Sequence, residues 1–136
     1  MNISDIHFAF RWFEWRKNAK SRKYSREYID RYAFSQFDEA FLYSPYISDA
    51  AKTKGQALMA DVDSATFGTG AADYAITYLC QFIIRGAEEG DFVTLLERNP
   101  RKISDWRKLW NKIRGTTPKR RRRKGVQNVS KKEKEN

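Results

Sequence analysis

The stretch Ala71–Arg85, with the sequence AADYAITYLCQFIIR, has the strongest helical pattern in the chain. Its apolar residues recur at intervals of three and four positions, which places them on one wide face of an α-helix. That face consists of Ala72, Ala75, Ile76, Leu79, Phe82 and Ile83. We therefore expect this helix to lie at the centre of the core, with the loop Asp61–Gly70 leading into it.

The N-terminal segment Asn2–Lys17 is rich in aromatic residues, and its period is ambiguous. One set of apolar residues has helical spacing (Ile3, Ile6, Phe10 and Phe13), and an overlapping set alternates as in a strand (Ile6, Phe8, Phe10 and Trp12). A helix capped by Ser4 and Asp5 is favoured, because no turn and second strand follow with which a strand could pair. The polar and cationic residues Asn18–Lys23 predict a break after this helix.

Two helices are expected between these segments. The first begins near Ser25 and continues as far as Tyr43, because helices usually end ahead of a proline and one follows two residues later. The second covers Ala50–Val62 and is capped by Ser48, although Gly55 weakens it. The first of these helices is expected to point Tyr28, Ile29, Tyr32 and Phe37 inward.

Two more helices are expected after the central one. Gly86–Gly90 predicts a turn, after which Asp91 caps a short helix that ends before Pro100. The last helix begins after Ser104 and ends at Gly115.

The 136 residues are enough for one domain with a tail. We expect an all-α protein, a compact bundle of five or six helices over residues 1–115. Residues 116–136 contain few apolar side chains and predict a disordered basic tail.

The single cysteine, Cys80, excludes an internal disulfide and a cysteine-based zinc cluster. It lies in the apolar run Tyr78–Ile84, which predicts a buried and inert thiol. That run is too short to cross a bilayer. We therefore expect no cofactor and no membrane partner, and a location in the cytoplasm or at the nucleoid, or in the nucleus if the source cell has one.

Positive charge is concentrated at the two ends of the chain, whose net charge is +10. Residues 1–32 hold eight Lys/Arg and four Asp/Glu, residues 33–97 hold three and ten, and residues 98–136 hold sixteen and three. The three segments therefore carry +4, −7 and +13. Basic ends predict an anionic partner such as nucleic acid, and the acidic middle equally allows self-association.

The last predicted helix has an apolar face and a basic face. Trp106, Leu109, Trp110 and Ile113 recur with helical spacing, whereas Arg107, Lys108, Asn111, Lys112 and Arg114 fall on the other side. Six consecutive cations follow a short spacer: Lys119, Arg120, Arg121, Arg122, Arg123 and Lys124. Arginine forks match phosphate oxygens, and neutralised phosphates release their condensed counterions. The sequence therefore predicts a non-catalytic accessory or regulatory protein that binds DNA or RNA without sequence specificity and with an affinity sensitive to salt.

A second basic segment lies near the N-terminus, and it consists of Arg11, Arg16, Lys17, Lys20, Arg22 and Lys23. Trp12, Trp15 and Tyr24 are interleaved with these cations. Cations beside exposed aromatic rings can bind single strands through phosphate contacts and base stacking. The alternative is that the tryptophans, Trp12 above all, belong to the core and that the cations follow the outer face.

A helix-turn-helix reader is a further alternative for the last two helices. Their connection, Arg98–Ile103, contains Pro100 and is longer than the turn of three or four residues in that motif.

Catalytic patterns are not found in the sequence. The only histidine, His7, lies among aromatic residues, which indicates a structural group rather than a base. Asp61-Val62-Asp63 opens like a calcium loop, but the sixth position is Thr66 instead of glycine. Gly68-Thr69-Gly70 lacks the third glycine and the preceding strand of a dinucleotide site. We therefore expect that the protein is not an enzyme.

The main alternative is a protein–protein interaction module, such as an inhibitor or an assembly subunit of a virus or mobile element. Its helical body would bind the partner, because aromatic residues dominate interface hot spots. The candidate anchors are Trp15, Tyr24, Tyr43, Tyr46 and Phe67. The acidic residues Asp38, Glu39, Asp49, Asp61, Asp63 and Asp73 would offer a surface to a basic partner, or simply confer solubility.

Overall fold

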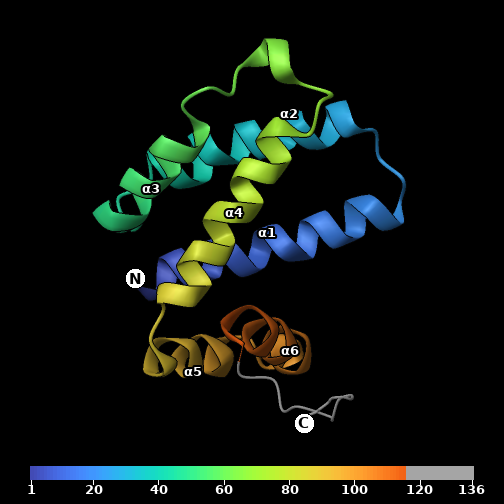
Figure 1. The fold of residues 1–136 in the computed structure, drawn as a ribbon. Helices are drawn as coiled ribbons and strands as arrows, with labels where there is room; N and C mark the ends of the chain where they lie inside the picture. Colours follow the sequence, from blue (N-terminus) through green and yellow to red (C-terminus); the bar gives the residue numbers. More distant parts are fainter. Residues whose placement is uncertain (116–136) are drawn as a thin grey trace, which may run out of the picture. The chain divides into compact units, whose positions relative to one another are not determined.

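The computed structural model describes residues 1–115, and within that range it contains six α-helices and no strand (Figure 1). The prediction of an all-α protein with five or six helices is confirmed. The predicted tail, residues 116–136, lies outside the described residues. The α-helices are α1 (Ile3–Ser21), α2 (Arg26–Gln36), α3 (Asp49–Met59), α4 (Ala71–Gly86), α5 (Glu89–Arg98) and α6 (Ile103–Arg114).

Three short helical segments join these helices: the π-helix η1 (Phe37–Leu42) and the 3-10 helices η2 (Ser64–Thr66) and η3 (Pro100–Lys102). The chain divides into two units, Met1–Trp106 and the part that begins at Arg107. The first unit therefore contains α1 to α5 and the start of α6. Among the described residues, no helix combines the length and the apolar character that a membrane span requires.

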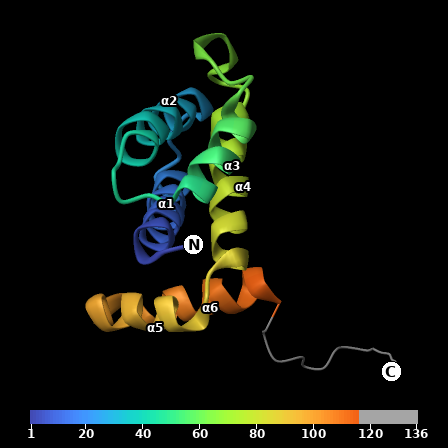
Figure 2. The ribbon, with the colours of Figure 1, turned by 90° about the vertical axis from the view of Figure 1, so that its left-hand side faces the viewer.

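Helix α4 is the centre of the first unit, as its sequence predicts. It contacts α1, α2 and α3 (Figure 1), and Figure 2 shows α1 and α2 on the same side of it. Ile76, Leu79 and Ile83 are fully buried, and burial of each such side chain stabilises the fold by about 1.5–3 kcal/mol. The prediction for Phe82 is wrong, because this side chain is 37% exposed at the edge of the buried face, under the ammonium group of Lys54.

The first helix is confirmed, but its cap lies two residues earlier than predicted. The side chain of Asn2 accepts a hydrogen bond from the backbone N–H of Asp5, and the Asp5 carboxylate accepts one from the backbone N–H of Asn2. This reciprocal pair is a capping box. Asp5 also accepts hydrogen bonds from the backbone N–H and the hydroxyl of Ser48, at 2.8 and 2.6 Å. The fully buried Asp5 therefore joins the first turns of α1 and α3.

Helix α1 also extends further than predicted. The break expected over residues 18–23 is wrong at its start, because the helix continues to Ser21. Lys23 then adopts a left-handed backbone with φ of 59°, and Ser25 caps the next helix by accepting from the backbone N–H of Tyr28. The reversal between α1 and α2 therefore needs only the four residues 22–25.

Helix α2 is confirmed from its predicted start, and η1 extends it to Leu42, close to the predicted end at Tyr43. Ile29 and Phe37 are buried as predicted, whereas Tyr28 is 50% exposed and that part of the prediction is wrong. The glycine that weakens α3 has a packing role, because a Cβ atom on Gly55 would lie 2.8 Å from ring atoms of both Phe37 and Phe41. Close contact between α3 and η1 requires a residue without a side chain there.

The start of α4 is capped from another helix. Gly70 is its N-cap residue, with φ of 90°, and it has no side chain with which to cap. The carboxylate of Asp30 on α2 accepts hydrogen bonds from the backbone N–H groups of Gly68, Gly70 and Asp73, at 2.8, 2.8 and 3.0 Å. Asp30 is fully buried. It thus satisfies amides that a helix N-terminus would otherwise leave without partners.

Helix α5 is confirmed, although it begins at Glu89, two residues before the predicted cap Asp91. The turn expected over residues 86–90 contains only Ala87 and Glu88, because α4 includes Gly86 and α5 begins at Glu89. At the other end the Asn99 side chain donates to the Leu95 carbonyl oxygen, and η3 then leads into α6. Helix α6 ends at Arg114, and Gly115 follows it with a left-handed φ of 72°, as predicted for the residue that stops this helix. The predicted cap at Ser104 is wrong, because η3 leads directly into a helix that begins at Ile103.

Candidate nucleic-acid interface

The predicted phosphate-binding residues of α6 occupy one side of the helix. At about 100° of rotation per residue, positions 107, 108, 111, 112 and 114 fall within an arc of about 160°. The apolar residues Trp106, Leu109, Trp110 and Ile113 fall within an arc of about 100° on the opposite side. The helix therefore separates its basic and apolar residues completely.

The side chains within the basic arc have different surroundings. Lys108 and Lys112 are exposed, while Arg107, Asn111 and Arg114 each take part in further interactions. The Arg114 guanidinium lies 4.7 Å from the centre of the Trp110 ring, which is one helical turn away. This cation–π contact orients Arg114 without neutralising its charge. The other predicted phosphate-binding residues, Lys119 to Lys124, lie outside the described residues.

The N-terminal basic segment contains one residue with a structural role. Arg16 donates from Nε to Oδ1 of Asp73 at 2.6 Å and from a terminal nitrogen to Oδ2 at 3.2 Å, and the two side chains are 20% and 8% exposed. This ion pair joins α1 to the first turn of α4. It also removes Asp73 from the predicted acidic surface, because a buried, paired carboxylate cannot meet a partner. Arg11, Lys17, Lys20, Arg22 and Lys23 are exposed.

The interleaved aromatic residues divide between the core and a half-buried stack. Trp12 is 3% exposed, and its indole N–H donates to the Thr77 hydroxyl at 3.2 Å, so it belongs to the core. Trp15 is only half-buried and stacks on Tyr32 of α2, with ring centres 3.7 Å apart and planes 10° apart. Trp15 also stacks on Trp12 at 5.5 Å. The rings of Trp12 and Trp15 from α1 and of Tyr32 from α2 are therefore nearly parallel to one another.

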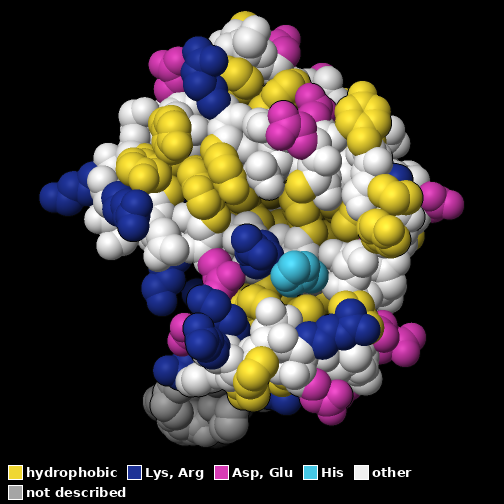
Figure 3. Space-filling model, turned by 180° about the vertical axis from the view of Figure 1, so that it is seen from behind, with side chains coloured by type: hydrophobic (Ala, Val, Ile, Leu, Met, Phe, Trp, Pro, Cys, Tyr) yellow, Lys and Arg dark blue, Asp and Glu magenta, His cyan; other side chains and the backbone are white. Residues whose placement is uncertain are grey.

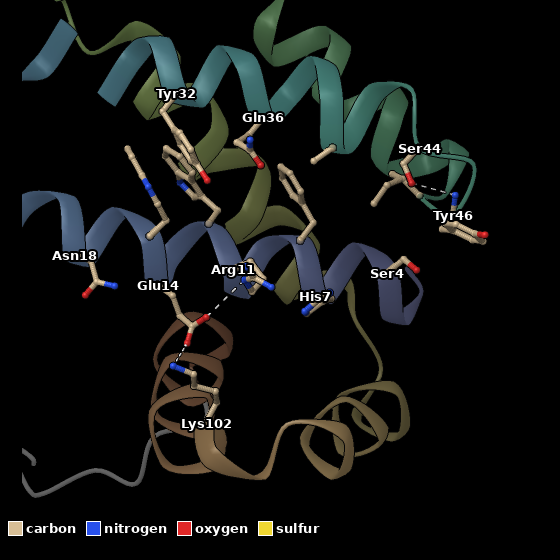
Figure 4. A pocket seen from close by; sticks show the side chains of 15 residues that line it. Ser4, His7, Arg11, Glu14, Asn18, Tyr32, Gln36, Ser44, Tyr46 and Lys102 are labelled. Atoms are coloured by element: carbon tan, nitrogen blue, oxygen red, sulfur yellow. Dashed lines mark hydrogen bonds and ion pairs between the residues drawn. The ribbon is translucent and has the colours of Figure 1, made fainter. Parts of the chain in front are cut away.

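These rings form one wall of a cleft that the sequence does not predict. The cleft has a volume of about 550 Å³ and lies along α1, between that helix and the α2–η1 segment (Figure 4). Seen from behind, hydrophobic side chains gather over this part of the first unit around the single histidine (Figure 3). The lining residues are Ser4, His7, Phe8, Arg11, Trp12, Glu14, Trp15, Asn18, Tyr32, Gln36, Ala40, Ser44, Tyr46, Ile47 and Lys102.

Two cations share one carboxylate at the edge of the cleft (Figure 4). Glu14 Oε2 lies 2.7 Å from the Lys102 ammonium nitrogen, and Oε1 lies 4.0 Å from Nε of Arg11. The three side chains together carry a net charge of +1 at neutral pH. The cleft thus combines aromatic faces with an excess of positive charge.

His7 lies in the same cleft and is expected to reduce stability at acid pH. Partial burial lowers the pKa of His7 from its ordinary value of 6.5, and the charge of Arg11 lowers it further, while Glu14 acts in the opposite direction. Between the lowered pKa and 6.5 the unfolded chain binds more protons, so stability rises with pH across that window. Thermal unfolding of the native protein and of His7→Gln between pH 4.5 and 8 should show a weaker pH dependence below pH about 6.5 in the variant. Parallel pH profiles for the two proteins would contradict this assignment.

Cys80 is fully buried, as predicted, and burial raises the pKa of its thiol well above the usual value. Within residues 1–115, no group of three or more His, Cys, Asp or Glu side chains is placed to hold a metal ion.

No family model, curated protein or solved structure matches the chain. The fold and the surfaces therefore define it only by class. It is an all-α protein with a basic helical face near its C-terminus and a cationic, aromatic cleft in its first unit.

Proposed function

We propose that this chain is a non-catalytic nucleic-acid-binding protein that neutralises phosphates through α6 and the arginine-rich arm after it. The observation that carries the proposal is the position of the positively charged side chains on α6. All five candidate residues lie within one arc of the helix, and four of them are cations. The next run of charge, Lys119–Lys124, follows only four residues after the helix-ending Gly115. A basic helical face and a basic run are therefore adjacent along the chain.

The two segments supply different parts of the interaction. The arm, with six cations and no acid, provides the counterion release that dominates non-specific affinity. Arg107, Lys108, Lys112 and Arg114 provide contacts fixed on a helix, which orient the protein on the phosphate backbone. Asn111 adds an amide that can bind a phosphate or a base edge. Such a protein acts as an accessory or regulatory factor wherever the nucleic acid is, in the cytoplasm, at the nucleoid or in a nucleus.

Direct binding of the full chain to labelled 20-mers tests the proposal. Fluorescence anisotropy at about 150 mM salt with duplex DNA, single-stranded DNA and a structured RNA should give dissociation constants of about 1–100 μM, the range of non-specific binding. An uncharged peptide nucleic acid of the same sequence serves as the control and should not bind. Failure to bind any of the three polymers at this salt concentration would exclude the proposal.

A second candidate function, a protein–protein interaction module, is favoured by exposed tyrosines in the first unit. Tyr43 and Tyr46 follow η1 and are 76% and 73% exposed, the highest values among the exposed large hydrophobic side chains of the described residues. Tyr46 also lines the cleft. Under this function Tyr43→Ser, at a residue outside the cleft lining, would weaken association with a partner or with a second copy, while nucleic-acid affinity would stay unchanged. Sedimentation velocity over a range of concentrations tests the self-association form directly.

A further inference from the structure

The cleft along α1 has the chemistry of a site for unpaired nucleotides. One wall is the stack of Trp12, Trp15 and Tyr32, whose planes lie within 10–22° of one another; Trp12 is 3% exposed, and Trp15 and Tyr32 are half-buried. A base of a single strand can add to such a stack as a further ring against its half-buried members, and every base has a ring face to offer. A duplex keeps its bases stacked within the helix and cannot present them in this way. Aromatic rings in an open cleft therefore favour a single strand over a duplex.

Charge on the other side of the cleft fits a phosphate. Arg11 is 67% and Lys102 48% exposed as side chains, and both are only partly neutralised by their shared partner Glu14. A phosphate placed beside them would meet one positive charge more than the Glu14 carboxylate neutralises. The amide side chains of Asn18 and Gln36 line the same cleft (Figure 4), and amides are among the groups that bind base edges by hydrogen bonds.

The polar content of the cleft argues against a partner helix as its occupant. Eight of the fifteen lining residues are polar or charged. Grooves that receive an amphipathic helix are predominantly hydrophobic, because the apolar face of the helix is the part that they bury. The volume of about 550 Å³ is also that of a site for a small ligand. These features suit a short length of single strand.

We propose that the cleft between α1 and the α2–η1 segment binds unpaired nucleotides of a single-stranded nucleic acid, with bases stacked on the Trp15–Tyr32 wall and a phosphate held by Arg11 and Lys102. The inference rests on the proposed function and adds a preference to it. The C-terminal cations bind any phosphate backbone, and the cleft selects strands whose bases are unpaired.

The preference is measured as the ratio of affinities of the full-length protein for a labelled single-stranded 12-mer and its duplex. Loss of a base stack costs about 5- to 150-fold in affinity, so Trp15→Leu should lower single-strand affinity by that factor and change duplex affinity little. Arg11→Gln combined with Lys102→Gln should lower the ratio without disturbing the core, because both side chains are exposed. The matched controls are Tyr78→Ala and Arg85→Gln, two exposed residues of α4 outside the cleft, which should leave the ratio unchanged.

The outcomes separate this inference from the proposed function. If the native protein binds both polymers and the Arg11/Lys102 variant lowers the two affinities equally, the cleft is not a single-strand site, although the C-terminal proposal stands. If the native protein binds neither polymer, the proposed function itself fails. Competition by free AMP as strong as that by the 12-mer would overturn strand binding in favour of a mononucleotide site. Thermal melts show whether a variant is folded. If Trp15→Leu is unfolded, the Arg11→Gln/Lys102→Gln variant decides whether the cleft binds single strands.

Discussion

Replacing Asp30 by alanine is expected to lower the free energy of unfolding by at least about 2 kcal/mol. Its carboxylate accepts hydrogen bonds from three backbone N–H groups at the start of α4, and it is fully buried. Alanine would leave the buried N–H groups of Gly70 and Asp73 without partners, at a cost of about 1–3 kcal/mol each, whereas Gly68 is exposed and its N–H can bond to water. Since small domains are stable by only about 5–15 kcal/mol, this is a large fraction of the total. Urea denaturation followed by circular dichroism measures the change.

The matched control is Glu39→Ala, which removes an exposed carboxylate from the neighbouring η1. A surface substitution of this kind should change stability by no more than about 0.5 kcal/mol. Asp30→Asn keeps one accepting oxygen and is expected to lie between the native protein and the alanine variant. Equal denaturation midpoints for Asp30→Ala and Glu39→Ala would show that Asp30 does not support the start of α4.

Replacing Arg120, Arg121, Arg122 and Arg123 together by alanine is expected to abolish most of the affinity for nucleic acid. Each duplex phosphate contact contributes about 0.9 to the slope of log K against log salt, so four lost contacts reduce the slope by up to about 3.6. Affinity near physiological salt should fall by about 100-fold or more, because this electrostatic contribution supplies nearly all of non-specific binding. Anisotropy with the full-length variant measures both quantities.

The control for this variant removes positive charge elsewhere in the chain. Lys52, Lys54 and Arg85 are the only cations of residues 33–97, and their replacement by glutamine lowers the net charge by three. If net charge alone decided affinity, this control would lose nearly as much as the arginine variant. The proposal requires a small effect from the control and a large one from the arginine variant. Similar losses in both would contradict a site located in the arm.

The helices could largely be predicted from the sequence because their signals are local. The spacing of apolar residues identifies α4, and hydroxyl caps at Ser25 and Ser48 identify the starts of α2 and α3. Helix ends were less predictable where the deciding group is distant in the chain. Asp30 caps α4 from forty residues away, and Asp5 joins α1 to Ser48, forty-three residues later. Nothing near these residues in the sequence marks such contacts.

The candidate site was predictable in its charges but not in its shape. Arg16 has the same sequence context as its cationic neighbours, and only the fold shows that it is paired with Asp73. The cleft depends on α1 and α2 lying side by side, so no single segment predicts it. One signal is present in the sequence: α1 carries aromatic residues around its circumference, more than packing on one side requires. Phe8 and Trp15 are the aromatic residues beyond those that packing on one side requires, and both line the cleft.

The most direct test of the central claim is the salt dependence of binding by the unmodified full-length protein. The association constant for a 20-bp duplex DNA would be measured between 50 and 300 mM salt, and log K plotted against log salt. If the six cations of the arm contact phosphates, the slope should be about −5 or steeper, and α6 would add to it. A slope near zero, or no measurable binding at 50 mM salt, would contradict the account.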